Sequence, residues 1–215
     1  MHIKNRTASI AFKFLVALLG SFGLAISSGL ASGSYDMQFH CMFTNLSNVA
    51  VCIYFWCSAI HHARGGNGAT PWHPKLKYAL TLCITVTFLV AHFMLNWGMV
   101  FMGGTFHIEM LMLHYLAPIG VILDWLLFDE KGHMQLADPP KWLIPLYVYF
   151  GYILVLVLGC GVSVTESCRW PYPFIDFDTL GVAGGIVNIV VLTIAVTLLG
   201  NLYVAADRAL AKRAK

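Results

Sequence analysis

Four polar residues on different hydrophobic segments fall at one depth, and two of them form a pair suited to acyl transfer. Thr44 lies about 9 Å of helical rise from one end of its segment, and His92, His114 and Asn188 lie at about 10–12 Å. A Thr hydroxyl becomes a nucleophile when a neighbouring base takes its proton, and His is the usual base. If Thr44 and His114 come within hydrogen-bond reach, they can attack an acyl carbonyl.

Helical spacing indicates which other polar groups face this pair. Positions three, four and seven residues apart share one side of a helix, so Ser47 and Asn48 share the face of Thr44. Asn96 shares the face of His92 in the same way. Asn48 or a nearby backbone amide could stabilise an oxyanion. The expected pocket residues on these helices are Ser47, Asn48, His92, Asn96 and Asn188.

The composition identifies the solvent of the elements that carry these residues. The chain has 215 residues, of which 59% are hydrophobic and 11% are charged, and its mean hydropathy is +0.74. Soluble domains average about 45–50% apolar and about 25% charged residues, so a soluble globular protein is excluded. Six apolar blocks approach or exceed the roughly 20 residues that span a bilayer. We expect one all-α integral membrane domain over residues 1–215, a bundle of six transmembrane helices at about 10–31, 39–62, 77–99, 107–128, 142–162 and 180–204.

The distribution of positive charge predicts the orientation. Twelve of the thirteen Lys and Arg residues fall on one side of the expected helices, and only Arg169 falls on the other. Cytoplasmic loops are enriched in Lys and Arg, so both termini are expected in the cytoplasm, in a membrane that suits the bacterial inner membrane. The net charge of +3 therefore reflects topology and gives no reason to expect a nucleic-acid partner. The active pair then faces the outer leaflet, and Asp124, near the inner end, is expected to bind backbone or an inner-side cation.

The longest outer connection, Ser163 to Thr179, is rich in aromatic residues and prolines. It is expected either to cap the bundle or to form an interfacial aromatic belt. Cys160 and Cys168 flank this connection and could pair in an oxidising space. Asp176 or Glu166 could orient His114, and spacing does not choose between them. The expected roof residues are Trp170, Tyr172, Pro173 and Phe174.

Three other functions compete with ester hydrolysis. Metal hydrolysis ranks low, because there is no HExxH motif and His107 and His114 are two turns apart. A haem-binding bundle would use His92 and His114 as iron ligands. A lipid-binding bundle or a small transporter is also open, although broken-helix repeats are absent from the sequence.

Three short segments resemble a known family. These are FTNLSN at residues 43–48, LHYLAP at 113–118 with the later Asp124–Trp125 pair, and WPYPFID at 170–176. Together they resemble the androgen-induced and androgen-dependent membrane hydrolases, in particular their bacterial branch. The resemblance implies six helices with both ends cytoplasmic and hydrolysis of fatty acid esters of hydroxy fatty acids. It places the family's threonine at Thr44 and its histidine at His114.

The sequence therefore predicts an intramembrane hydrolase of lipid-type esters. Thr44 is the expected nucleophile and His114 the expected general base, and the mechanism requires no metal or organic cofactor. The expected partners are a fatty acyl ester substrate and membrane lipids. The oligomeric state and the physiological ester stay open.

Overall fold

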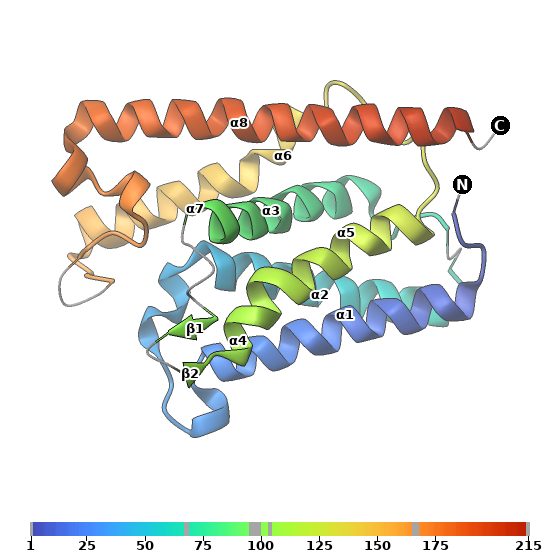
Figure 1. Ribbon diagram of the computed structural model, residues 1–215, viewed down its shortest axis with the longest axis horizontal. Helices are drawn as coiled ribbons and strands as arrows, with labels where there is room; N and C mark the ends of the chain where they lie inside the picture. Colours follow the sequence, from blue (N-terminus) through green and yellow to red (C-terminus); the bar gives the residue numbers. More distant parts are fainter. Residues whose placement is uncertain (1, 67–68, 95–99, 103–104, 165–167, 214–215) are drawn as a thin grey trace.

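The protein is a bundle of long helices, described by a computed structural model. The structure describes residues 2–66, 69–94, 100–102, 105–164 and 168–213. Within these ranges, six helical segments are long and apolar enough to cross a membrane (Figure 1). The predicted all-α membrane fold with six helices is confirmed.

Three of the six segments are interrupted or bent. The uninterrupted ones are α1 (Arg6–Ser27), α2 (Phe43–Ala63) and α3 (Pro74–Phe93). The fourth combines α4 (Ile108–Leu111), a π-helical turn (Met112–Leu116) and α5 (Ala117–Phe128). The fifth combines α6 (Pro139–Trp142), α7 (Ile144–Leu154) and a second π-helical turn (Val155–Gly159). The sixth is α8 (Phe177–Arg213), with non-helical backbone at Gly181. The short elements are 3-10 turns at Leu30–Ser32, Met37–Cys41 and Pro173–Ile175 and the antiparallel strands β1 (Phe101–Met102) and β2 (Thr105–Phe106).

Some helix ends differ from the expected spans for identifiable reasons. α3 begins at Pro74, because proline fits the first helical turn, where its missing N–H costs nothing. α2 begins only at Phe43, since the preceding residues form the 3-10 turn Met37–Cys41. α8 continues to Arg213, well past the expected end of its span.

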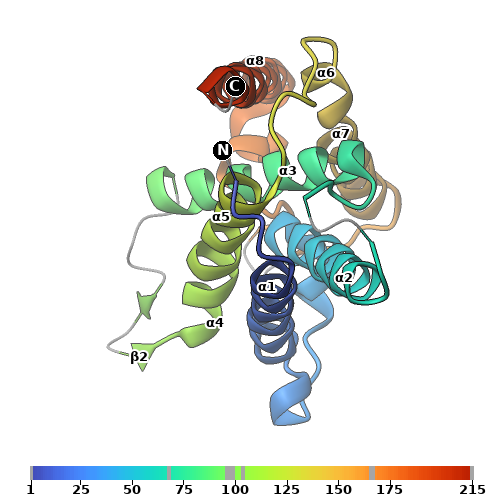
Figure 2. The same ribbon diagram turned by 90° about the vertical axis from the view of Figure 1, so that its right-hand side faces the viewer.

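The helix arrangement separates two groups of segments on either side of α3. α1, α2, α3 and α5 pack against one another, and α7 and α8 pack on α3 from the other side (Figure 2). The chain termini lie at the same end of the bundle (Figure 1), as an even number of crossings requires. The region between α3, α7 and α8 is therefore bordered by helices from both groups.

A buried network of ion pairs connects α1, α3 and α5 near the end of the bundle where the chain termini lie. Asp124 is fully buried and accepts from the Lys13 Nζ at 2.7 Å and from the Lys77 Nζ at 2.5 Å. Lys77 also contacts Asp129 at 2.6 Å, and Ser9 accepts from Lys13 at 3.0 Å. Of the two kinds of partner expected for Asp124, backbone or a cation, the structure shows cations, the side chains of Lys13 and Lys77. Two lysines and two aspartates balance their charges, as buried ions require.

Candidate active site

The side chains of Thr44 and His114 meet inside the bundle. The Thr44 Oγ1 lies 3.3 Å from the His114 Nε2, and both residues are buried, with 8% and 6% of their surface exposed. Thr44 occupies the first turn of α2, and His114 lies at the centre of the π-helical turn Met112–Leu116. The first backbone N–H groups of a helix have no intrahelical partner, and the start of α2 has no side-chain cap. The hydroxyl therefore sits at the positive end of a helix.

The π-helical turn has a local cause in the sequence. Pro118 follows His114 by four residues, so it has no N–H to bond the His114 carbonyl and its ring would clash with that oxygen. The backbone widens instead, and the N–H of Ala117 bonds the carbonyl of Met112, five residues earlier. Turns of this kind are frequent at functional sites. Here the turn carries the imidazole that faces Thr44.

The second nitrogen of His114 fixes the direction of its contact with Thr44. Nδ1 lies 3.2 Å from the carbonyl oxygen of Met110. A carbonyl only accepts hydrogen bonds, so Nδ1 carries the proton and Nε2 is left with its lone pair. The Thr44 hydroxyl then donates to Nε2, which is the arrangement that a general base needs.

Of the two acids named from the sequence, Asp176 does not perform this orienting role. The Asp176 carboxylate accepts from the hydroxyl of Thr179, at 2.7 Å, and from backbone N–H groups at the start of α8. Glu166 lies outside the described residues. The partner of the His114 Nδ1 is thus a backbone carbonyl one turn back, which spacing arguments about side chains do not consider.

Asn48 and Ser47 both donate hydrogen bonds to the backbone carbonyl of Thr44. The Asn48 Nδ2 donates to the carbonyls of Thr44, at 2.8 Å, and Leu113, at 3.1 Å, which ties α2 to the π-helical turn. Its amide hydrogens are therefore engaged with backbone. Ser47 donates to the Thr44 carbonyl at 3.0 Å and contacts the Thr87 hydroxyl of α3 at 3.1 Å. These bonds fix the backbone that carries Thr44.

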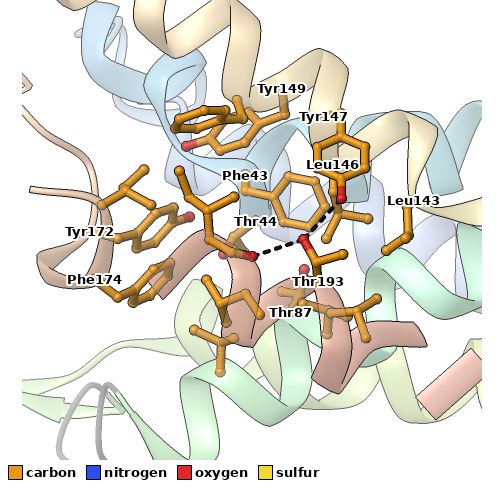
Figure 3. Close-up of a pocket in the computed structure, with 17 residues that line it drawn as sticks. Phe43, Thr44, Thr87, Leu143, Leu146, Tyr147, Tyr149, Tyr172, Phe174 and Thr193 are labelled. Atoms are coloured by element: carbon orange, nitrogen blue, oxygen red, sulfur yellow. Dashed lines mark hydrogen bonds between the residues drawn. The ribbon is translucent and has the colours of Figure 1, made fainter. Parts of the chain in front are cut away.

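An apolar cavity of about 120 Å³ extends from Thr44 between α3, α7 and α8 (Figure 3). Its walls are apolar and aromatic residues, and its few polar side chains are hydroxyl groups. Tyr147 of α7 and Thr193 of α8 bond to each other at 2.9 Å across it. His114 does not line this cavity, so Thr44 stands between the cavity and its base. The other lining residues include Phe43, Val86, Leu143, Leu146, Tyr149, Phe150, Ile189 and Val196.

The loop before α8 closes the cavity near Thr44. Tyr172 is buried, and its hydroxyl lies within hydrogen-bonding range of the Thr44 side chain and of the backbone of Phe43 and Thr44. Burial raises the pKa of Tyr172, so the phenol is neutral at physiological pH. Its ring stacks on Phe174, with centroids 5.1 Å apart. The Phe174 carbonyl in turn accepts from the Asn188 Nδ2 at 3.1 Å, which anchors the loop to α8.

The remaining expected pocket residues lie away from the cavity or outside the described residues. Among the residues named from the sequence, Thr44, Tyr172 and Phe174 line the cavity. Trp170 is buried under the loop and donates to Asp178 at 3.1 Å, while Pro173 is exposed. His92 stacks on Phe88, at 5.8 Å between ring centroids. Asn96 lies outside the described residues.

Two further expectations from the sequence concern a disulfide bond and a metal site. Cys160 and Cys168 are both free cysteines, so the pairing considered from the sequence is not formed, and the Cys168 thiol donates to the Trp170 carbonyl at 3.3 Å. Within the described part of the chain, no group of three or more His, Cys, Asp or Glu residues is placed to hold a metal ion. His114 is engaged by Thr44 and Met110. The candidate site in the described residues therefore consists of the Thr44 hydroxyl, the His114 imidazole and the apolar cavity wall.

Sequence reasoning missed the residues of α7 and α8 that form most of the cavity. Tyr149 and Tyr147 lie on expected membrane helices, where Tyr is usually read as an interfacial anchor. Leu143 and Val196 carry no polar signal at all. Thr87 and Thr193 offered the only signal, since they are hydroxyls on apolar helices, but such residues commonly bond their own backbone, and both do so here.

No protein-family model, no curated protein and no solved structure matches this chain. The likeness to the membrane hydrolases therefore rests on the three short sequence segments, two of which contribute Thr44 and His114 to one contact.

Proposed function

We propose that this protein is an intramembrane hydrolase of lipid-type esters with Thr44 as nucleophile and His114 as general base. One observation carries the proposal: the Thr44 hydroxyl stands between a buried imidazole, at 3.3 Å, and an apolar cavity. A buried Thr–His contact also occurs as simple interhelical packing. Packing alone would not require the hydroxyl to border a cavity large enough for part of a lipid.

In the acylation step, the Thr44 Oγ1 attacks the ester carbonyl carbon while its proton passes to the His114 Nε2. The tetrahedral oxyanion forms beside the first turn of α2, at the positive end of that helix. The Tyr172 hydroxyl is neutral and close, so it is a second donor. Collapse of the intermediate breaks the bond to the alkoxide, which takes the proton from Nε2 and leaves as an alcohol.

In the deacylation step, water replaces the alcohol. Nε2 takes a proton from the water, whose oxygen attacks the acyl carbon attached to Thr44. The second intermediate expels the Thr44 oxygen, which recovers its proton from Nε2, and the fatty acid is released. The Met110 carbonyl holds the Nδ1–H through both steps, so the imidazole keeps one orientation.

The surroundings favour an amphiphilic ester that comes from the membrane. The cavity walls are apolar, and α7 and α8 form one side of it within segments that can cross a membrane. We propose both termini on the cytoplasmic side, from the charge bias of the loops, which places Thr44 in the outer leaflet. The family resemblance adds fatty acid esters of hydroxy fatty acids as the first substrates to test.

The test is hydrolysis of a panel of fatty acyl esters by purified protein in detergent, with labelling by an alkyl fluorophosphonate probe that reacts with activated hydroxyls. We expect turnover in the wild type and loss of both turnover and labelling in Thr44→Ala. Ser32→Ala is the matched control, because its hydroxyl is exposed and bonds the Gly29 carbonyl three residues earlier, away from Thr44. Turnover that persists in Thr44→Ala, or no turnover in well-folded wild type, refutes the proposal.

A further inference from the structure

The cavity beside Thr44 is deep and has a definite floor. One wall extends from Phe150 of α7 to Leu143, the residue that precedes α7, and the α8 wall extends from Ile189 to Val196. Each stretch spans seven residue-to-residue steps, or about 10 Å of helical rise. Leu143 and Val196 are only 6% and 5% exposed, and with Val86 they belong to the packed core beneath. The space therefore ends on close-packed side chains.

The shape of this space matches one hydrocarbon chain that starts at the nucleophile. Tyr172 and Phe174 lie at the end of the space near Thr44, and Leu143 lies at the opposite end (Figure 3). A chain whose carbonyl group is at Thr44 would therefore extend towards the floor. The walls between the two ends are aliphatic and aromatic apart from hydroxyls. The Tyr147 and Thr193 hydroxyls are hydrogen-bonded to each other, and Thr193 also bonds the Ile189 carbonyl of its own helix. These hydroxyls therefore do not need hydrogen bonds from a ligand.

The depth of the cavity limits the length of the acyl chain that it can hold. A bilayer has a hydrocarbon core of about 30 Å, so a lipid chain that fills one leaflet extends about 15 Å. The cavity offers about 10 Å along its helices. A leaflet-length chain could continue along this direction only by displacing the buried floor, and displacing a close-packed core is costly.

We propose that this space is an acyl-chain chamber that selects medium-length chains, shorter than those of the surrounding membrane lipids, with Val196 and Leu143 as its floor. The proposal rests on the proposed hydrolase function, because it assigns the acyl group of that substrate to the space between α3, α7 and α8. It names the substrate class as esters of medium-chain fatty acids.

The first experiment detects chain binding without any hydrolysis. Thr44→Ala protein is irradiated with decanoic acid that carries a terminal diazirine, and the labelled peptides are mapped by mass spectrometry. We expect labels on residues 143–146 and 192–196, and competition by unlabelled decanoic acid at lower concentration than by stearic acid. Labels confined to other helices, or equal competition by the two acids, overturn the chamber.

The second experiment changes the floor and reads the chain-length profile. Val196→Phe should lower decanoyl ester hydrolysis by about tenfold relative to butyryl ester, since pocket fit is worth about tenfold or more per methylene. Val196→Ala should move the preferred chain to a longer one. Ile194→Phe is the matched control on the same helix, because Ile194 is 55% exposed and absent from the cavity wall. An unchanged profile in both Val196 variants overturns the chamber.

The two experiments separate failure of the chamber from failure of the hydrolase. Labelling at the floor without any esterase activity leaves the chamber standing and removes the hydrolase. Esterase activity that depends on Thr44, with labels elsewhere and a profile indifferent to Val196, removes the chamber and leaves the hydrolase.

Discussion

Pro118 stands four residues after His114 and ends the π-helical turn that holds the imidazole against Thr44. The proline removes the N–H that an α-helix would offer to the His114 carbonyl. Position 118 therefore controls the direction of a side chain one turn away. This relationship joins a backbone irregularity to the proposed chemistry.

Replacing Pro118 with alanine should straighten this helix and misplace the base. An α-helical register restores the missing bond and turns His114 by part of a turn, so kcat should fall by about 10²-fold or more. The melting temperature should stay equal or rise, since alanine is the better helix former. Both quantities are measured on the same purified sample.

Pro74→Ala is the control for this change. Pro74 occupies the first turn of α3, where proline costs no hydrogen bond, so its replacement should leave kcat unaltered. A Pro118→Ala protein with wild-type kcat would show that the π-helical turn has no role in activity.

Isosteric replacement of Thr44 should separate the nucleophile from the fold. Thr44→Val keeps the shape and removes the hydroxyl, so kcat should fall by roughly 10³-fold or more. The loss of the buried hydrogen bonds of this hydroxyl should cost about 1–3 kcal/mol of the free energy of unfolding. Thr44→Ser retains an attacking oxygen and should keep measurable activity. Equal kcat values for the valine and serine variants would contradict the assigned role.

Asn48 should act on stability more than on turnover. Its Nδ2 bonds the carbonyls of Thr44 and Leu113, and the residue is fully buried. Asn48→Ala leaves these carbonyls without that donor, so the free energy of unfolding should fall by about 1–3 kcal/mol. At temperatures where the variant is folded, kcat should fall less than tenfold. A larger fall in kcat without a loss of stability would make Asn48 an oxyanion donor.

Tyr172 should contribute to turnover as a neutral donor. Tyr172→Phe keeps the stacking on Phe174 and removes the hydroxyl near Thr44, so kcat should fall by about 10²-fold. Because the pKa of Tyr172 is raised, the wild-type enzyme should not lose activity through ionisation of this phenol near pH 10. The pH profile of kcat in both proteins measures this. A Phe variant with full activity would reduce Tyr172 to a packing role.

Sequence reasoning singled out Thr44 and His114 because polar groups are conspicuous in apolar helices. Thr44 and His114 stood out by depth, and the structure brings them to 3.3 Å. The same reasoning could not predict the backbone register of the π-helical turn. In that register the Met110 carbonyl, rather than an acid, accepts from the His114 Nδ1. It also had no access to the floor, because Leu143 and Val196 are apolar residues among many apolar residues. Polar chemistry is visible in such a sequence, and the shape of an apolar cavity is not.

The buried network around Asp124 should behave as one stabilising unit. Asp124 is fully buried between Lys13 and Lys77, so Asp124→Asn leaves two buried ammonium groups with one carboxylate, Asp129. Removing one partner of a buried pair costs about 3–5 kcal/mol, because a charge is left uncompensated. The double variant Lys13→Met, Asp124→Asn keeps the neutral pair of Lys77 and Asp129, so it should recover more than half of that loss.

The free energy of unfolding in detergent is measured for the wild type, the two single variants Lys13→Met and Asp124→Asn, and the double variant. An exposed pair provides the matched control: Arg169→Gln breaks the contact with Asp178 at the surface and should change stability by less than about 0.5 kcal/mol. Additive losses in the double variant would mean that Lys13 and Asp124 do not interact. Because the network and Thr44 lie near opposite ends of the bundle, kcat of the folded single variant should match the wild type.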